Sequence, residues 1–142
     1  MRIKILVVGK VKEKAYNERI NEFLKWINRD IPIELIFFKD NKHIRLEKKI
    51  ESHLRNKDHI ICLSEEGKKQ SSIQFSKYIF NKTKDLIFLI GGPDGHTKGI
   101  KEKADQTISL SKMTFPHEMA LLILMEQIYR AIAIKKGSKY HR

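Results

Sequence analysis

The chain has 142 residues and is 41% hydrophobic, which suits one domain with a proper core and argues against disorder. Its 29 Lys and Arg residues outnumber 17 Asp and Glu residues, giving a net charge of +12. This charge favours polyanionic partners, and the alternative is an ordinary solvated, lysine-rich surface. The longest apolar run, Met119 to Met125, is far shorter than the ~20 residues of a membrane span, and no signal peptide is visible, so we expect a cytoplasmic protein that does not bind a membrane.

The first part of the chain alternates apolar strands with amphipathic helices. Ile3 to Val8 is typical of a strand buried on both faces of a parallel sheet, and Ile33 to Phe38 predicts a second strand. Between them, apolar residues from Glu13 to Asp30 recur at helical spacing. A charged helix is predicted from about His43 to Lys57, and its basic face is either an RNA contact or an ordinary solvated surface.

The same alternation continues to the end of the chain. The predicted elements are a strand His59 to Leu63, a loop Ser64 to Lys68, a helix Ser72 to Phe80, strands Asp85 to Ile90 and Thr107 to Ser111, and a helix of about His117 to Lys136. No linker, repeat or low-complexity tract divides them. The pattern predicts a single α/β domain over residues 1–142, with three layers around a largely parallel sheet of five to six strands.

Three loops follow the carboxyl ends of predicted strands, at Leu63-Ser64, Gly91-Gly92 and Ser111-Lys112. Ligands of such folds bind at this edge of the sheet, so the three loops should converge on one pocket. The run Gly91 to Gly95 matches neither a dinucleotide fingerprint nor a P-loop. Its doubled glycine after a buried strand instead predicts a backbone that a small ligand approaches closely.

Metal binding and cysteine chemistry are not expected. The six histidines are scattered along the sequence, and Cys62 has no partner cysteine for a zinc site or a disulfide. Cys62 also lies inside an apolar strand, the position of a small buried hydrophobe rather than of a nucleophile. A reduced, cytoplasmic compartment agrees with this cysteine count.

The last helix is apolar on nearly all sides, so its own sheet and a second subunit should cover it. Within it, Glu126 and Arg130 are spaced for an ion pair. That pair either holds the helix together or directs Arg130 at a phosphate or nucleobase. The terminal residues Tyr140, His141 and Arg142 combine a stacking ring, a group that titrates near neutrality and a phosphate-binding cation, which suits RNA binding or catalysis.

Four motifs together carry a resemblance to a known family. They are Leu89 to Gly95 (LIGGPDG), Ser109 to His117 (SLSKMTFPH), Glu126 to Ala131 (EQIYRA) and the terminal YHR. In this order and spacing they closely resemble the bacterial methyltransferases that modify N3 of a pseudouridine in large-subunit (23S) rRNA, a family of the SPOUT (α/β-knot) superfamily. The resemblance extends along the whole chain.

The resemblance implies a fold, a cofactor and partners. The C-terminal segment should form a trefoil knot, and S-adenosylmethionine should be the methyl donor. The enzyme should be a homodimer acting on a pseudouridine in the 23S rRNA stem-loop that faces the decoding centre of assembled ribosomes. By motif, the residues implied in cofactor binding are Leu63, Gly91, Leu110, Ser111, Lys112, Met113, Thr114 and Phe115.

The catalytic and substrate-binding residues are assigned from the same motifs. His141 is the candidate for assisting loss of the N3 proton, Tyr140 and Arg142 would place the base and the RNA backbone, and Arg130 and His117 would contact the substrate. The sequence leaves three alternatives: a SPOUT enzyme acting on tRNA or another rRNA base, a non-catalytic RNA-binding protein associated with the ribosome, and, more distantly, a nicotinamide oxidoreductase.

Overall fold

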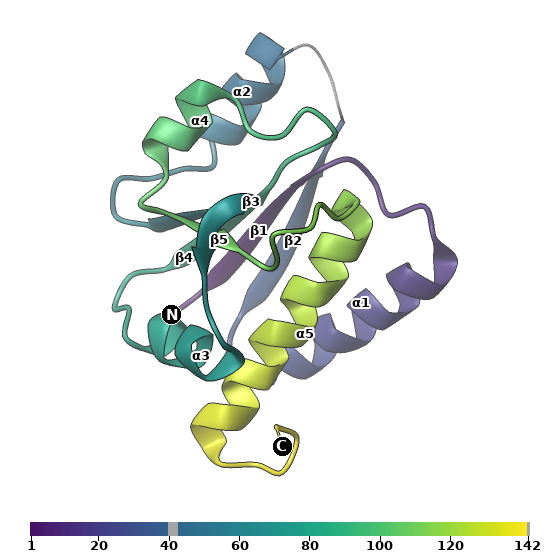
Figure 1. Cartoon of the computed structure of the whole chain (residues 1–142), viewed down its shortest axis with the longest axis vertical. Coiled ribbons are helices and arrows are strands. Elements are labelled where there is room, and N and C mark those ends of the chain that lie inside the picture. Colours follow the sequence, from purple (N-terminus) through teal and green to yellow (C-terminus); the bar gives the residue numbers. More distant parts are fainter. Residues whose placement is uncertain (40–42, 142) are drawn as a thin grey trace.

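The protein is described by a computed structural model that covers residues 1–39 and 43–141 (Figure 1). The elements, in chain order, are β1 (Ile3–Val8), α1 (Lys14–Ile27), β2 (Ile33–Phe38), α2 (His43–Glu51), β3 (His59–Lys69), α3 (Ser72–Phe80), β4 (Leu86–Ile90), α4 (Lys98–Lys103), β5 (Gln106–Ser109) and α5 (His117–Lys136). The five strands form one sheet in the order β2-β1-β4-β3-β5. Every strand pair in it is parallel, as predicted.

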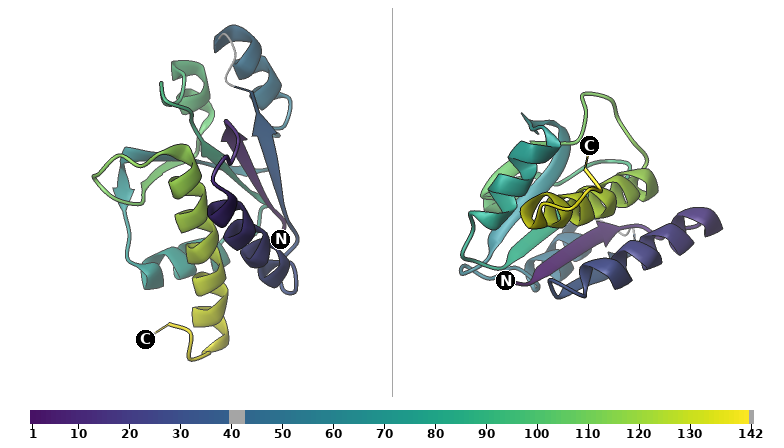
Figure 2. Two further views of the ribbon diagram at one scale, coloured as in Figure 1. Left: turned by 90° about the vertical axis from the view of Figure 1, so that its right-hand side faces the viewer. Right: turned by 90° about the horizontal axis from the view of Figure 1, so that it is seen from below.

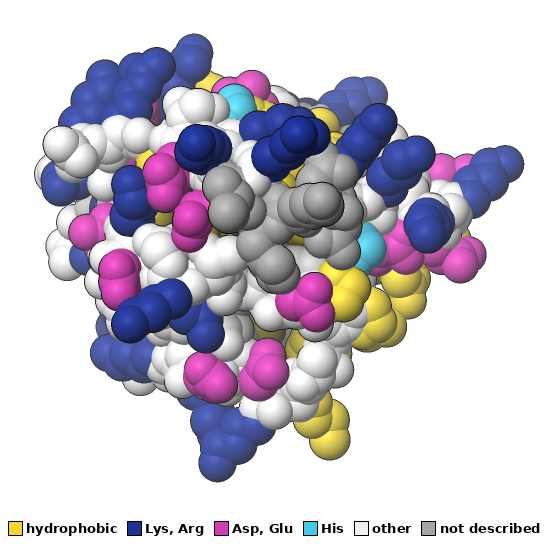
Figure 3. All heavy atoms as spheres, turned by 90° about the horizontal axis from the view of Figure 1, so that it is seen from above, with side chains coloured by type: hydrophobic (Ala, Val, Ile, Leu, Met, Phe, Trp, Pro, Cys, Tyr) yellow, Lys and Arg dark blue, Asp and Glu magenta, His cyan; other side chains and the backbone are white. Residues whose placement is uncertain are grey.

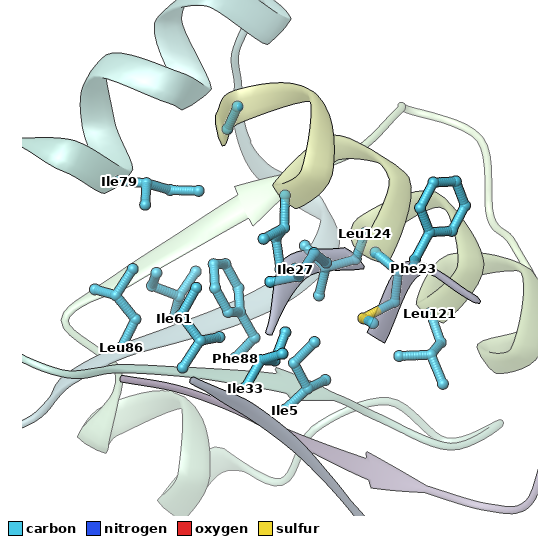
Figure 4. Packing of buried hydrophobic residues seen from close by; sticks show 14 of the residues in the cluster. Ile5, Phe23, Ile27, Ile33, Ile61, Ile79, Leu86, Phe88, Leu121 and Leu124 are labelled. Carbon is cyan, nitrogen blue, oxygen red and sulfur yellow. The ribbon is translucent and has the colours of Figure 1, made fainter. Parts of the chain in front are cut away.

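Helices cover both faces of the sheet and complete the predicted three layers. On one face α5 packs between α1 and α3, as the right-hand view of Figure 2 shows. That side holds the larger core, in which Phe88 of β4 meets Ile27 of α1 and Leu124 of α5 (Figure 4). On the other face α2 and α4 close a smaller core around Leu89. In the described parts of the chain no helix is long and apolar enough to span a membrane.

Strand β3 corrects one prediction, because residues Ser64 to Lys68 continue the strand instead of forming a loop. Leu63 and Lys68 both pair with Ile108 of β5, so the intervening residues bulge out of the ladder. Gly67 permits this path, since a Cβ atom there would lie 2.7 Å from the backbone of Ile108. The segment is polar, so it lacks the apolar side chains by which a strand is predicted from sequence, and backbone pairing with β5 holds it in the sheet.

Helix α2 ends at Glu51, six residues before the predicted boundary at Lys57. The hydroxyl of Ser52 donates to the carbonyl of Lys49 at 2.6 Å, and the carboxylate of Asp58 accepts from the Arg55 amide at 3.2 Å. Such side-chain bonds compete with the helical ladder and favour turns.

The trefoil knot of the C-terminal segment stays a prediction.

Candidate functional site

A pocket of about 300 Å³ lies where β4 and β5 end and α5 begins, beside the bulge of β3 that follows Leu63. The segments predicted as loops at Leu63-Ser64, Gly91-Gly92 and Ser111-Lys112 do converge on it, although the first of them belongs to strand β3. Of the residues predicted to bind the cofactor, all but Lys112 line the pocket: Leu63, Gly91, Leu110, Ser111, Met113, Thr114 and Phe115. Lys112 lies in the same loop with its side chain exposed.

The glycine-rich loop after β4 forms one wall of the pocket. Gly92 and Gly95 form an isolated antiparallel bridge, in which the Gly95 amide donates to the Gly92 carbonyl at 2.9 Å. A Cβ atom at Gly91 would lie 2.9 Å from the Gly95 carbonyl carbon, and Gly95 has φ +72°. The turn therefore requires glycine and brings bare backbone to the pocket wall.

His96 completes this wall and was not predicted from the sequence. Its Nε2 atom lies 3.0 Å from the carbonyl oxygen of Leu63, and burial lowers the pKa of the imidazole. A carbonyl only accepts, so Nε2 carries the proton and donates it. His96 thus fixes the Leu63 backbone at the pocket. Its position directly after the Pro93-Asp94-Gly95 turn was the signal in the sequence that could have identified it.

The loop after β5 closes the opposite side of the pocket. The Ser109 hydroxyl donates to the Ser111 carbonyl at 2.7 Å, and the Met113 amide donates to the Ser111 hydroxyl at 3.0 Å. Thr114 reaches across to the Glu65 carboxylate at 3.4 Å. These bonds order the backbone, whereas the Met113 side chain is 74% exposed at the rim.

Charged side chains of both signs line the pocket. Glu65, Glu66 and Asp94 contribute carboxylates, and Lys101 contributes an ammonium that lies 4.0 Å from Glu66. A ligand that carries cationic and anionic groups would find partners for both. In the part of the chain that the structure describes, no group of His, Cys, Asp and Glu side chains is placed to hold a metal ion. Burial raises the pKa of the Cys62 thiol to about 11, so this cysteine is protonated and unreactive near neutrality.

His117, predicted to contact the substrate, lines the pocket at the start of α5. Its Nε2 atom lies 2.5 Å from the carbonyl oxygen of Lys10 in the loop after β1. This nitrogen is already occupied, so His117 joins the pocket to that loop instead of offering Nε2 to a substrate.

The residues predicted for catalysis gather around Arg130. Its Nε atom donates to the Glu126 carboxylate at 2.7 Å, its Nη1 atom lies 3.1 Å from Nδ1 of His141, and its guanidinium lies 4.9 Å from the centre of the Tyr140 ring. The ion pair predicted from the spacing is therefore present, and Arg130 also contacts the tail, whereas its direction at a phosphate or nucleobase stays a prediction. Arg142 lies outside the described residues.

This Arg130 cluster does not meet the pocket of its own chain. Arg130 follows His117 by 13 residues along α5, which corresponds to about 20 Å along the axis. Figure 1 shows the chain turning back after α5, so that the C-terminus lies beside the far end of that helix, opposite the edge where the strands end. Within the chain, the described catalytic candidates Tyr140 and His141 therefore lie away from the predicted cofactor residues.

A parallel α/β sheet with a glycine-walled pocket at its strand ends defines an enzyme-like small-molecule site. Comparisons with known proteins specify it further. Residues 1–141 match the family described as "Predicted SPOUT methyltransferase". The chain belongs to this SPOUT methyltransferase family, whose members use S-adenosylmethionine as methyl donor.

Relatives cover the whole chain. It is 45% identical to a "Ribosomal RNA large subunit methyltransferase H" of Prochlorococcus marinus, over 99% of this chain and 96% of the relative. A protein of the same name from Streptococcus uberis is 39% identical and covers 100% of both chains. A solved "probable methylase family protein" from Haemophilus influenzae has TM-score 0.60 at 10% identity, covers 99% of this chain and 70% of its own, and supports the fold alone.

Proposed function

We propose that the protein transfers a methyl group from S-adenosylmethionine to N3 of a pseudouridine in 23S rRNA, in the stem-loop that faces the decoding centre of assembled ribosomes. Residues 1–142 act as one domain in the cytoplasm. The observation that carries the proposal is the pocket between the β3 bulge and the ends of β4 and β5, found in a SPOUT methyltransferase whose relatives are named for large-subunit rRNA.

The pocket residues fit S-adenosylmethionine. The cofactor carries a sulfonium, an ammonium and a carboxylate, and the pocket offers carboxylates together with Lys101. The backbone at Leu63 and Gly91 and along the loop from Leu110 to Phe115 would hold it, with Lys112 at the rim. When bound, the cofactor supplies an electrophilic methyl group.

A homodimer would bring the Arg130 cluster to a pocket. One side of α5 leaves Met119, Ile123, Glu126 and Arg130 only partly buried, at spacings that repeat along a single helix face. Two such faces packed antiparallel around a two-fold axis would set Met119 opposite the partner's Arg130. The partner's tail would then lie beside the pocket that begins near His117, so each active site would combine two subunits.

The Arg130 contact revises the role expected of His141. A guanidinium only donates hydrogen bonds, so Nδ1 of His141 accepts, and the neutral ring carries its proton on Nε2. The ring then offers an N–H donor to the substrate and holds no free lone pair for the N3 proton. In this role His141 stabilises the uracil-type anion at a carbonyl oxygen next to N3, and the proton leaves to solvent.

Positioning provides the remaining rate enhancement. Tyr140 is 41% exposed, so its ring can stack on the target base, and Arg130 adds positive charge beside it. Arg142 would bind an RNA phosphate. The reaction forms one N–CH₃ bond, breaks one S–CH₃ bond and releases the N3 proton.

The test is transfer of labelled methyl groups to intact ribosomes that lack the modification, with free rRNA and tRNA in parallel. We expect label on the ribosomes, located at pseudouridine N3, and none when residues 140–142 are removed. Label on tRNA or on naked rRNA would assign another RNA to the same site. Cofactor binding without transfer would indicate an RNA-binding protein.

A further inference from the structure

The loop between β1 and α1, residues 9–13, is attached to the start of α5 by two consecutive side chains. His117 meets the Lys10 carbonyl through Nε2 at 2.5 Å. The Glu118 carboxylate accepts from the Lys12 amide and, at 3.4 Å, from the Glu13 amide. The loop is thus tied to the helix that borders the methyl-donor pocket.

Gly9 makes this close approach possible. Its φ of +108° lies in the region that favours glycine, and a Cβ atom there would lie 2.7 Å from Nε2 of His117. The next residues turn their charges outward: Lys10, Lys12 and Lys14 are exposed, and Val11 packs on the core. The acidic groups at this loop are the exposed Glu13 of the loop itself and the Glu118 carboxylate from α5, which already bonds to the backbone amides.

Other lysines lie around the same pocket. Lys101 lines it from α4, and Lys98 and Lys112 are exposed nearby in the chain. On the face seen from above, Lys and Arg side chains are spread widely, with Asp and Glu side chains between them (Figure 3). A polyanion approaching the pocket therefore meets positive charge on more than one side.

We propose that the β1–α1 loop is an RNA-phosphate contact at the mouth of the methyl-donor pocket, with Lys10 and Lys12 as the contacting groups and His117 and Glu118 as positioning residues. The inference rests on the proposed RNA substrate and names the surface that holds it. An ordered backbone with outward ammonium groups suits phosphates, because it fixes where the charges lie without fixing the base sequence. Since His117 also lines the pocket, the loop sets the distance between the bound backbone and the methyl donor.

The first experiment compares Lys10→Glu/Lys12→Glu with Lys57→Glu/Lys84→Glu, which changes the net charge equally on exposed loops at the amino ends of β3 and β4. Binding to unmodified ribosomes and to a stem-loop RNA is measured over a series of salt concentrations. For the loop variant we expect weaker binding and a slope of log affinity against log salt that falls by about 2. The control should keep nearly the wild-type slope. Equal losses of RNA affinity and equal changes of salt slope in the two variants would overturn the proposal.

Further readouts separate this proposal from the proposed function and from another partner. Affinity for S-adenosylmethionine should be unchanged in the loop variant. The binding assay needs no methyl transfer, so it gives a result even when the methylated base is not the one proposed. If polyglutamate competes for the loop as well as RNA of equal charge does, the surface is one for acidic proteins and the RNA assignment is wrong.

The positioning role has its own test. Glu118→Ala removes a negative charge, which alone would strengthen RNA binding, yet we expect several-fold weaker binding because the Lys12 amide loses its anchor. Glu118→Gln keeps an acceptor oxygen and should retain most of the affinity. In the Lys10→Glu/Lys12→Glu background, Glu118→Ala should not weaken RNA binding any further. Stronger binding by Glu118→Ala, or full additivity with the loop variant, would refute the positioning role.

Discussion

The Nη1 atom of Arg130 lies 3.1 Å from Nδ1 of His141, so the terminal histidine is bound by a group that can only donate. The same guanidinium is held by Glu126, and Tyr140 packs edge-on against Tyr129 with ring centres 4.9 Å apart. These contacts fold the tail back on α5 and present the tail in a defined orientation. The tautomer of His141 follows from this arrangement and leads to the first prediction.

His141→Gln should retain much more methyl transfer than His141→Ala. The Gln amide can replace the Nε2–H donor but cannot act as a base. Loss of one donor to a developing anion lowers turnover by about 100-fold, so this is the expected size of the Ala defect. We expect the slope of the pH–rate profile to be the same in all three proteins. If Gln is as inactive as Ala and the pH dependence disappears with the ring, His141 acts as the base instead.

His96 should control affinity for the methyl donor through the Leu63 carbonyl. His96→Leu leaves that carbonyl without its side-chain donor, which costs about 1–3 kcal/mol when the group is buried. We expect His96→Leu to bind the cofactor about tenfold more weakly than wild type, as measured by calorimetry. His96→Gln keeps an N–H at a similar reach and serves as the matched control. Equal cofactor affinities of the His96→Leu and His96→Gln variants would show that this hydrogen bond does not control cofactor binding.

Stability should fall as the pH drops below about 6.5, the ordinary pKa of histidine. The pKa of His96 is lowered by burial, and that of His59 is lowered by burial and by Lys82. Because both folded pKa values lie below the unfolded value, the unfolded chain binds more protons in this range, and unfolding becomes easier. The two groups contribute their full stability above pH 6.5.

The measurement is urea unfolding between pH 7.5 and 5.5. The His59→Gln/His96→Gln variant should show a smaller decline than wild type over that range. His53→Gln, a change at another partly buried histidine, is the control. A decline of the same size in the double variant would show that other groups cause it.

Gly67→Ala should destabilise the sheet edge where β3 passes β5. The added methyl would lie 2.7 Å from the backbone of Thr107 and Ile108, which cannot move as a flexible side chain can. Overpacking of this kind costs about 2–3 kcal/mol. A Cβ atom at Gly95 would meet no atom within 4 Å, so only the φ of +72° disfavours alanine there. We expect Gly95→Ala to lower the free energy of unfolding by about 1 kcal/mol. Equal losses of stability in the two variants would mean that β3 and β5 pack less closely at Gly67.

The sequence predicts well those elements that carry their own signal. Strand β1 and helix α5 begin and end where predicted, since apolar runs mark them. Helix α3 also agrees, and Ser71 caps it with Gln74 in a capping box. The three segments predicted as strand ends did converge on one pocket, because parallel strands run to the same edge, although Leu63-Ser64 proved to lie at a bulge within β3.

Other features depend on long-range contacts that leave no local pattern. The polar end of β3 becomes a strand only through pairing with β5, which lies about 40 residues later in the chain. The His117–Lys10 contact joins residues separated by 107 positions. Nor could the motifs show that Arg130 and the pocket lie at opposite ends of α5, because neighbouring motifs in a family need not meet within one subunit.

Mixing two inactive variants should restore activity if each active site combines two subunits. Gly91→Val would disrupt the pocket wall, because a Cβ atom at this position would lie 2.9 Å from the Gly95 carbonyl carbon. Removal of residues 140–142 would eliminate the tail. After equal mixing and exchange, half of the dimers would be mixed, and each would hold one intact pocket beside one intact tail. Methyl transfer should therefore recover to about a quarter of wild type. Mixing Gly91→Val with a second pocket variant, Ser111→Trp, is the control and should recover nothing, because no intact pocket is present. Absence of recovery in the first mixture, with dimer exchange verified, would mean that the tail reaches the pocket of its own chain by a rearrangement of α5.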